Sequence, residues 1–135
     1  MLKNVLILCT GNSCRSIIAE ALINSELNQY GIKAYSSGVQ ASGKVNINAK
    51  RVLKENSCWK DEYHSKVIEE IVDINFALII TVCDNAKESC PIFPKKTEVI
   101  HIGFEDPDGK NYSEFIRTYQ LIKNNLVKIV YNKLI

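Results

Sequence analysis

The sequence predicts an α/β protein of three layers, in which a four-stranded parallel sheet carries helices on both faces. Short β-prone apolar runs alternate along the chain with stretches whose apolar residues recur at helical spacing. The most apolar run, residues 76–82, is continuous rather than alternating, as expected for a strand buried on both faces. A length of 135 residues, with 46% apolar and 24% charged residues, fits one globular domain that spans residues 1–135.

The predicted elements follow in order along the chain. Four runs have strand character, namely residues 3–8, 32–37, 76–82 and 99–102. Helical periodicity is carried by Ile18, Ala19, Leu22 and Ile23 after Arg15, by Ala49, Val52 and Leu53, and by Phe115, Ile116, Tyr119, Ile122, Leu126, Ile129 and Val130 after Ser113. The face of one further helix is suggested by Val67, Ile68, Ile71 and Val72. Gly31 and Gly38 mark the ends of the first helix and the second strand.

This order of elements indicates where a ligand binds. Strands that alternate with helices form parallel sheets through right-handed crossovers. In such sheets ligands lie at the carboxyl ends of the strands. We therefore expect the chemistry just after residues 8, 38, 82 and 102.

Composition narrows the class of partner. The five cysteines are an odd number, and the N-terminal apolar run is too short for a signal peptide, so we expect a reducing, cytoplasmic location. No apolar stretch approaches the roughly 20 residues that span a bilayer. A net charge of +2 is too small for nucleic-acid binding. We expect a monomer whose partner is a small molecule, with no nucleic acid and no membrane.

Residues 9–15, Cys-Thr-Gly-Asn-Ser-Cys-Arg, lie at the first strand end and open the first helix. A loop of this length turns successive N–H groups inward at the positive end of the helix dipole, where they bind an anion. The Arg15 guanidinium grips two oxygens of a tetrahedral oxyanion, and Gly11 is expected to relieve backbone strain. Oxyanion binding is therefore assigned to Thr10, Gly11, Asn12, Ser13, Cys14 and Arg15.

Cys9 is the predicted nucleophile of this loop. The positive surroundings lower the pKa of a cysteine in such a place, so we expect Cys9 to rest as a thiolate beneath the bound anion. Ser16 is placed to donate a hydrogen bond to that thiolate. The alternative is a chance match of spacing, and the position at a strand-to-helix junction speaks against it.

Two further cysteines, Cys83 and Cys90, follow the third strand. If the first and third strands are neighbours, they lie about 4.8 Å apart, and Cys83 comes close to the Cys9 loop. Seven helical steps hold Cys83 and Cys90 about 10.5 Å apart, too far for a disulfide. Pairing therefore requires this segment to unwind, which the poor helix formers among residues 85–91 favour.

Other cysteines and the histidines have structural interpretations. We expect Cys58 to be a buried small hydrophobe and Cys14 to support the loop. His64 and His101 are expected to be core or capping residues. A zinc site is a weaker alternative, since no close-spaced pair occurs among its candidates Cys9, Cys14, Cys83 and Cys90.

An acidic loop, Gly-Phe-Glu-Asp-Pro-Asp-Gly at residues 103–109, follows the last strand. Three carboxylates repel an anion unless one is protonated, which is the state of a general acid that gives its proton to a departing oxygen. Asp106 is the candidate, because Pro107 biases it to an extended backbone of fixed direction. A solvated turn is the structural alternative for this loop.

These motifs together resemble the thioredoxin-coupled arsenate reductases, which share the fold of the low-molecular-weight protein tyrosine phosphatases. The resemblance runs nearly end to end and rests on residues 9–16, 35–38, 83–91, 103–109 and 113–115. It implies a relay in which Cys9 attacks arsenate and Asp106 helps water or hydroxide leave. Cys83 then releases arsenite by forming a disulfide with Cys9. Cys90 finally attacks Cys83, which leaves a disulfide between Cys83 and Cys90.

The resemblance also implies the partners. Thioredoxin is the expected external reductant, no cofactor is bound, and phosphate and sulfate compete with arsenate as oxyanions. Against the phosphatase branch, Ile17 follows Ser16 where proline is common, and no aromatic residue follows Pro107. The second hypothesis is nevertheless a phosphomonoesterase that uses only Cys9, Arg15 and Asp106. A non-enzymatic thiol sensor of arsenite or a metal is the third.

Some members of the resembled family hold potassium near this loop. Matching ligands in this chain are Asn12, Glu20, Ser36 and Ser65, whereas Val67 replaces a usual aspartate. The replacement speaks against potassium dependence. Glu105 also stands where aspartate is usual, with little expected effect because Asp106 keeps its place.

Overall fold

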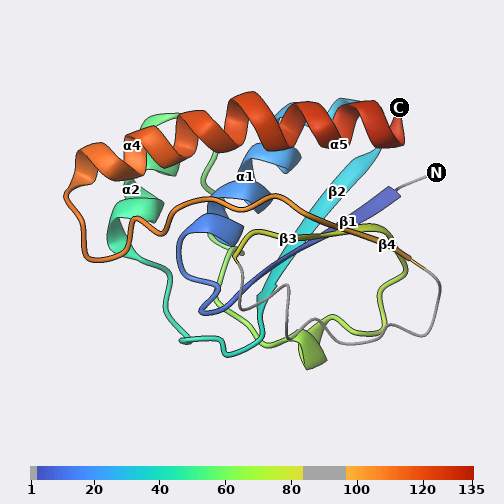
Figure 1. The fold of residues 1–135 in the computed structure, drawn as a ribbon, viewed down its shortest axis with the longest axis horizontal. Coiled ribbons are helices and arrows are strands. Elements are labelled where there is room, and N and C mark those ends of the chain that lie inside the picture. Colours follow the sequence, from blue (N-terminus) through green and yellow to red (C-terminus); the bar gives the residue numbers. More distant parts are fainter. Residues whose placement is uncertain (1–2, 84–96) are drawn as a thin grey trace.

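The computed structural model describes residues 3–83 and 97–135 of the chain. Within these residues one parallel sheet has the strand order β2–β1–β3–β4 (Figure 1). The strands are β1 (Lys3–Cys9), β2 (Ile32–Gly38), β3 (Phe76–Thr81) and β4 (Glu98–His101). The predicted four-stranded parallel sheet with helices packed on it and the four predicted strands are confirmed. Because every pairing is parallel, the carboxyl ends of the strands meet at one edge.

β1 and β3 occupy the centre of the sheet, and their sequences explain this place. Residues 5–9 of β1 and 78–81 of β3 are all buried. A central strand covered on both sides exposes neither face, so it needs the continuous apolar run predicted for it. The edge strand β4 differs, since Glu98 and Val99 lie at the surface.

The helices that follow β1 and β2 begin and end at identifiable residues. α1 (Arg15–Leu27) packs against β1 and β2 and continues into the 3₁₀ turn η1 (Asn28–Tyr30). Gly31, with φ of 78°, ends this turn in the left-handed region, as predicted. α2 (Ile47–Glu55) begins after Asn46, whose side chain accepts hydrogen bonds from two N–H groups of the first turn.

The C-terminal helix has three parts that join end to end across α1 (Figure 1). They are α4 (Tyr112–Leu121), the π-helical segment η3 (Ile122–Leu126) and α5 (Val127–Leu134). The prediction of this helix is confirmed, but Ile116 is exposed and Ile129 is half-buried. In α4 the buried face is Phe115, Thr118 and Tyr119, and the wider turn of η3 rotates the face that follows it.

The predicted helix face at residues 67–72 is wrong. Val67 has an extended backbone and forms a β-bridge with Gly38, so no helix begins there. Only the 3₁₀ turn η2 (Ile68–Glu70) follows, closed by a hydrogen bond from Ile71 N–H to Ile68 O. Ile71 is buried, whereas Val67 and Val72 are exposed.

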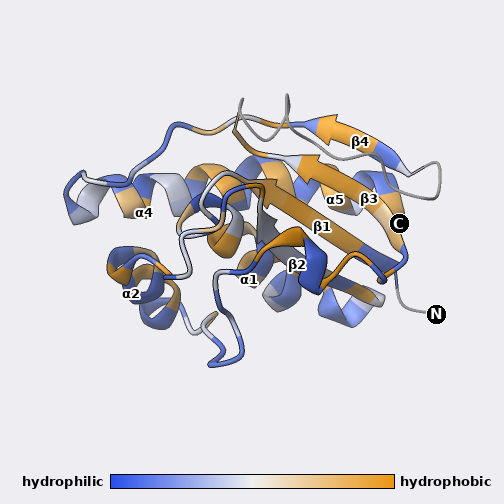
Figure 2. Ribbon diagram, turned by 90° about the horizontal axis from the view of Figure 1, so that it is seen from below, coloured by the Kyte–Doolittle hydropathy of each residue, from blue (hydrophilic) through white to orange (hydrophobic). Residues whose placement is uncertain are grey.

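The layers follow from these elements. The α-helices of the described residues lie on one face of the sheet, and the 3₁₀ turn η2 lies on the opposite face (Figure 1). Among the described residues, η2 alone therefore represents the helical layer predicted on that second face. Figure 2 shows that the strands are the most hydrophobic part of the ribbon. None of the helices within residues 3–83 and 97–135 combines the length and apolar character needed to cross a membrane.

Candidate active site

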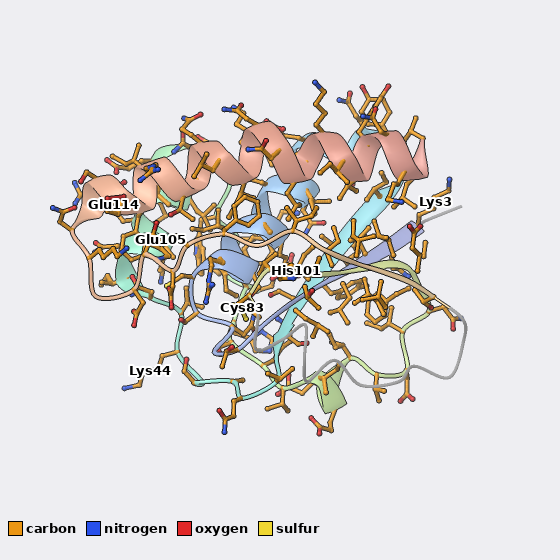
Figure 3. The ribbon with its side chains drawn as sticks, in the orientation of Figure 1. Lys3, Lys44, Cys83, His101, Glu105 and Glu114 are labelled. Carbon is orange, nitrogen blue, oxygen red and sulfur yellow. The ribbon has the colours of Figure 1, made fainter. Side chains whose placement is uncertain are left out.

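Three loops meet at the carboxyl edge of the sheet. Residues 10–14 follow β1, Cys83 lies just after β3, and residues 102–109 follow β4. Backbone hydrogen bonds join them beyond the strands, from Val82 N–H to Leu8 O at 3.0 Å and from Phe104 N–H to Val82 O at 3.1 Å. Figure 3 shows Cys83 at this edge, beside the loop that leaves β1. The structure thus brings the predicted loops together.

The backbone of the Cys9 loop is held by its carbonyl groups. The carbonyl oxygens of residues 9, 10, 11 and 13 accept hydrogen bonds from the N–H groups of residues 39, 40, 42 and 46, and that of Cys14 accepts from Ile18 N–H. Within residues 3–83 and 97–135, no protein group accepts a hydrogen bond from the N–H groups of residues 11–15. Adjacent donors left free at the start of α1 form a nest suited to an anion.

Asn12 fixes the shape of this loop from inside the protein. It is fully buried and has φ of 50°, in the left-handed region that asparagine tolerates better than most residues. Its Nδ2 donates to Ser16 Oγ at 2.8 Å and to Ser36 Oγ at 2.9 Å, and its Oδ1 accepts from Lys66 N–H at 2.8 Å. The expectation that Gly11 relieves the strain is wrong, because the strained residue is Asn12, whose side chain secures it.

Gly38 is a site residue that the sequence did not single out beyond its strand end. A Cβ built on Gly38 would lie 2.5 Å from Thr10 O and 3.1 Å from Asn12 Cβ. No side chain fits there without displacing the loop backbone. The available signal was a glycine at the carboxyl end of β2, the same edge that carries Cys9.

The two described thiols of the predicted relay lie in contact. Cys9 and Cys83 share a side-chain hydrogen bond, and Thr10 Oγ1 lies 3.1 Å from Cys83 Sγ. Both cysteines are buried. The predicted neighbourhood of Cys83 and the Cys9 loop is confirmed, because β1 and β3 are paired strands.

The predicted thiolate state of Cys9 is contradicted. The hydrogen bond with Cys83 and the burial of the thiol raise the pKa of Cys9 far above its ordinary value. The charge of Arg15 and the Thr10 N–H lower this pKa, but they do not overcome the rise. A thiol that shares its proton with a second buried thiol is more stable than an anion cut off from water.

Arg15 connects the loop to the segment after β4. Its Nη1 donates to Phe104 O at 3.0 Å, and its Nη2 lies 3.4 Å from Asp106 Oδ2. The Arg15 side chain is only 12% exposed, and its buried Nε has no hydrogen-bond partner among residues 3–83 and 97–135. A buried donor with no partner costs stability in the protein alone, so this Nε is available for a hydrogen bond to an anion in the nest.

Asp106 stands at the mouth of the loop. Its side chain is 51% exposed and forms the ion pair with Arg15, while its Oδ1 accepts from Asp108 N–H at 3.0 Å. The predicted place of Asp106 beside the Cys9 loop is confirmed. The turn, which was the structural alternative, is present and holds the Asp106 carboxyl group toward Arg15, while the acid role of Asp106 stays a prediction.

Comparison with known proteins identifies the family of this chain. The family model of low molecular weight phosphotyrosine protein phosphatases matches residues 4–134. The chain belongs to this phosphatase family. The predicted resemblance to its arsenate reductases is also confirmed by sequence: the arsenate reductase of Staphylococcus aureus (strain N315) is 37% identical over 121 residues, which cover 90% of this chain and 91% of that protein. The arsenate reductase of Brevibacillus brevis is 40% identical over 116 residues, covering 85% and 84%.

Solved structures of the phosphatase family agree with the fold. The arsenate reductase of Archaeoglobus fulgidus has a TM-score of 0.77 and 32% identity, covering 93% of this chain and 98% of that one. The low molecular weight protein tyrosine phosphatase of T. tengcongensis has a TM-score of 0.84 and 26% identity, covering 98% and 99%. Structural likeness therefore extends to both activities named within the phosphatase family.

Other predicted residues of this phosphatase-family site have supporting places. Ser16 is fully buried, and its Oγ accepts a hydrogen bond from Asn12 Nδ2. Cys14 Sγ lies 3.6 Å from Ser13 Oγ, and burial raises the pKa of Cys14 to about 12. Cys58 is buried, as predicted, and its thiol donates to a backbone carbonyl.

The histidines also have structural contacts. His101 Nδ1 lies 2.8 Å from Thr81 Oγ1 on the neighbouring strand. His64 is exposed and lies 3.3 Å from Glu70 Oε2. Cys90, the third cysteine of the predicted relay, lies outside the described residues. Within residues 3–83 and 97–135 no group of three or more His, Cys, Asp or Glu side chains is placed to hold a metal ion.

The residues that match a potassium site are engaged within the protein. Asn12 Oδ1 accepts from Lys66 N–H, Ser36 Oγ donates to Glu20 Oε1 at 2.6 Å, and Ser65 Oγ donates to a loop carbonyl at 3.0 Å. Lys66 is only 7% exposed, and its charge acts on Glu20. The expectation that potassium is not required stays a prediction, and Lys66 is a buried residue that the sequence analysis missed.

Proposed function

We propose that this protein reduces arsenate to arsenite through Cys9, Cys83 and Cys90, with thioredoxin as the reductant. The observation that carries the proposal is the contact between the Cys9 and Cys83 thiols beside a nest of free N–H donors. A phosphate ester needs one nucleophile, whereas a two-electron reduction needs two thiols within bonding reach. The relatives named arsenate reductases, at 37% and 40% identity, support this choice.

In the first step the oxyanion binds to the N–H groups of residues 11–15 and to Arg15. Cys9 gives its proton to the Asp106 carboxylate and its sulfur attacks arsenic, so that a sulfur–arsenic bond forms and the bond from arsenic to one hydroxyl oxygen breaks. The departing hydroxyl takes this proton from Asp106 and leaves as water. The free Nε of Arg15 gains its missing hydrogen bond as the anion arrives.

In the second step the Cys83 sulfur attacks the sulfur of Cys9. A disulfide forms between them, the sulfur–arsenic bond breaks, and its electron pair stays on arsenic, which takes up the proton of the Cys83 thiol on an oxygen and leaves as arsenite. Two thiols are thereby oxidised and arsenic(V) becomes arsenic(III). Thr10 Oγ1, at 3.1 Å from Cys83 Sγ, steadies the attacking sulfur.

In the third step Cys90 attacks Cys83, which frees Cys9 and leaves a disulfide between Cys83 and Cys90. Thioredoxin reduces that disulfide, so the relay needs no bound cofactor and runs in a reducing compartment, the cytoplasm. Phosphate and sulfate compete for the nest because they share the tetrahedral shape and charge of arsenate. One chain suffices for all three steps, in keeping with the expected monomer.

The test is a thioredoxin-coupled assay with arsenate, run on the wild type and on single Cys→Ser variants. Cys9→Ser, Cys83→Ser and Cys90→Ser should each abolish multiple turnovers, whereas the control Cys58→Ser should keep them. Cys90→Ser should still release about one arsenite per protein in a single turnover. Intact multiple turnover in Cys90→Ser would overturn the relay.

The second candidate is a phosphomonoesterase that uses only Cys9, Arg15 and Asp106. It is favoured by the family model and by the likeness to the T. tengcongensis phosphatase structure. An aryl phosphate assay of the same variants separates the two. Aryl phosphate hydrolysis that far outpaces arsenate reduction, and that survives Cys83→Ser, would select the phosphatase. Turnover of either substrate would exclude a mere thiol sensor.

A further inference from the structure

Asn46 joins the start of α2 to two loops of the active site. Its backbone N–H donates at 3.0 Å to Ser13 O in residues 9–15, the anion loop. Its Oδ1 accepts from two N–H groups of the first helical turn at 2.8 and 3.4 Å, which caps the helix. Its Nδ2 donates to Asp108 Oδ1 at 2.8 Å. Asn46 therefore connects the anion loop, α2 and the acidic loop that follows β4.

The helix cap decides which way the Asn46 amide points. Backbone N–H groups only donate, so the amide oxygen must face the first turn of α2. The amide nitrogen then points away from the helix and meets Asp108, whose carboxylate only accepts. The backbone of Asn46 is fixed as well, since its carbonyl accepts from Lys50 N–H at 3.0 Å. The donor that reaches the acidic loop is thus held in place by a helix.

Asp108 connects this anchor to the predicted acid. It follows Pro107 in a tight turn, which a hydrogen bond from Lys110 N–H to Pro107 O closes at 3.0 Å. Its own N–H donates to Asp106 Oδ1 at 3.0 Å. The other carboxyl oxygen of Asp106 lies 3.4 Å from Arg15 Nη2. Each oxygen of Asp106 therefore has its own partner, and one of these partners depends on Asp108.

These contacts close a ring at the mouth of the site. The ring runs from Ser13 through Asn46, Asp108 and Asp106, and returns through Arg15 to the anion loop. The Asp106 side chain is 51% exposed, so burial does little to fix its carboxyl group. A reacting group that lies about 1 Å out of place can lose about 100-fold in rate. The ring supplies the constraint that burial does not.

We propose that the hydrogen bond between Asn46 and Asp108 is a positioning contact that aims the Asp106 carboxyl group at the departing oxygen. The proposal deepens the function proposed above and rests on it. Asn46 and Asp108 act through Asp106. Breaking their contact should therefore slow the chemical step and leave anion binding as it is.

The test uses substitutions that break the contact and substitutions that keep or restore it. Asp108→Ala removes the acceptor, and Asn46→Asp keeps a capping oxygen but sets two carboxylates against each other. Asp108→Asn keeps an acceptor for the Asn46 amide. When Asn46→Asp and Asp108→Asn are combined, the amide and the carboxylate exchange places, so the hydrogen bond forms in the reverse direction. Glu105→Ala is the matched control, because it removes an exposed carboxylate of the same loop.

Two measurements separate chemistry from binding, namely single-turnover release of arsenite at saturating arsenate and calorimetric binding of inorganic phosphate. Asp108→Ala and Asn46→Asp should slow release about tenfold or more, with phosphate affinity within about twofold of the wild type. Asp108→Asn should be slowed far less than Asp108→Ala, and the exchanged pair should recover most of the rate that Asn46→Asp loses. Glu105→Ala should match the wild type. A wild-type rate in Asp108→Ala, an exchanged pair as slow as Asn46→Asp, or a loss of phosphate affinity as large as the loss of rate would each overturn the proposal.

Aryl phosphates separate this contact from the proposed function. A wild type that releases no arsenite but hydrolyses aryl phosphates would reject arsenate reduction and still test the contact, because Asp106 would protonate the leaving oxygen there too. Phenolate is a poorer leaving group than 4-nitrophenolate and needs this proton more. Asp108→Ala should then slow hydrolysis of phenyl phosphate more than that of 4-nitrophenyl phosphate, and equal slowing would overturn the positioning role. A wild type that turns over neither arsenate nor aryl phosphates would overturn both proposals.

Discussion

The front and the rear of the anion loop differ in how their polar groups are satisfied. The rear, made of Asn12, Ser16, Ser36, Glu20 and Lys66, is buried, and each of its side chains has a hydrogen-bond partner. The front consists of Cys9, Arg15, Cys83 and Asp106. It has a half-exposed carboxylate, and the buried Nε of Arg15 has no hydrogen-bond partner in the part of the chain that the structure describes.

This difference indicates a division of labour. Satisfied buried polar groups lock one conformation, whereas donors left free at a loop are held ready for charge that arrives with the substrate. Substitutions at the rear should therefore lower stability and activity together. Substitutions at the front should lower activity and spare stability.

The largest effect is expected for Asn12→Ala, at the rear. The change removes three buried hydrogen bonds and places alanine at φ of 50°, so the free energy of unfolding should fall by about 3–5 kcal/mol. Urea unfolding measures this loss. Asn12→Gly is the control, since it loses the same hydrogen bonds but tolerates the left-handed backbone, and it should be about 1 kcal/mol more stable than Asn12→Ala. A loss below 1 kcal/mol for both would erase the contrast between rear and front.

Arg15→Lys, at the front, should lower kcat/KM for arsenate by about 100- to 1000-fold, because the two-pronged grip is lost while the charge stays. Its unfolding temperature should match or exceed that of the wild type, since the buried Nε without a partner disappears. Arg117→Lys, a change at an exposed arginine, is the matched control. A large drop in the stability of Arg15→Lys would mean that Arg15 stabilises the loop, as the residues at the rear do.

At the rear of the loop, Glu20→Gln should change how the free energy of unfolding depends on pH. The pKa of Glu20 is raised from 4.5 to about 7 by burial. Between these values the native state binds a proton that the unfolded chain has released, so wild-type stability falls as pH rises through this window. Relative to the wild type, Glu20→Gln should therefore gain up to about 3 kcal/mol between pH 4.5 and 7. Urea unfolding across pH 4–8 measures this, and a difference that does not change with pH would contradict it.

The smallest expected effect concerns the pKa of Cys9 at the front of the loop. The hydrogen bond with Cys83 is the largest cause of the raised pKa of Cys9, so Cys83→Ala should lower that pKa. Alkylation of Cys9 by iodoacetamide at pH 8, followed by mass spectrometry, should become about tenfold faster for each pKa unit lost. Cys58→Ala should leave the rate unchanged. Slower alkylation in Cys83→Ala would mean that Cys83 activates the Cys9 thiol instead.

The front was largely predictable from the sequence because its chemistry is local. Residues 9–15 carry nucleophile, donors and guanidinium within one loop, and a buried apolar strand before Cys83 implied its neighbourhood to Cys9. The ionisation of Cys9 was not predictable, since it depends on a contact between side chains 74 positions apart in the chain. The spacing of loop residues carries no information about such a contact.

The rear escaped prediction because it is assembled by tertiary contacts. Lys66 lies in a polar stretch that is typical of a surface, but it is buried and its backbone is hydrogen-bonded to Asn12 and Gly38. Contact with Gly38 also explains the wrong helix at residues 67–72, since the bridge between Val67 and Gly38 keeps that backbone extended. Apolar periodicity predicts which face of a helix or strand is buried, but it does not predict which distant segments pair with each other.

The close contacts around Gly38 affect how loss of function at this position should be interpreted. Because even a methyl group there meets the Thr10 carbonyl, a saturation library screened for arsenate tolerance should score position 38 as severely as the nucleophile. Glycine offers no reactive atom, so such a library would confuse shape with chemistry. Only a measurement on purified variants, in which anion capture and electron transfer are followed separately, tells the two apart.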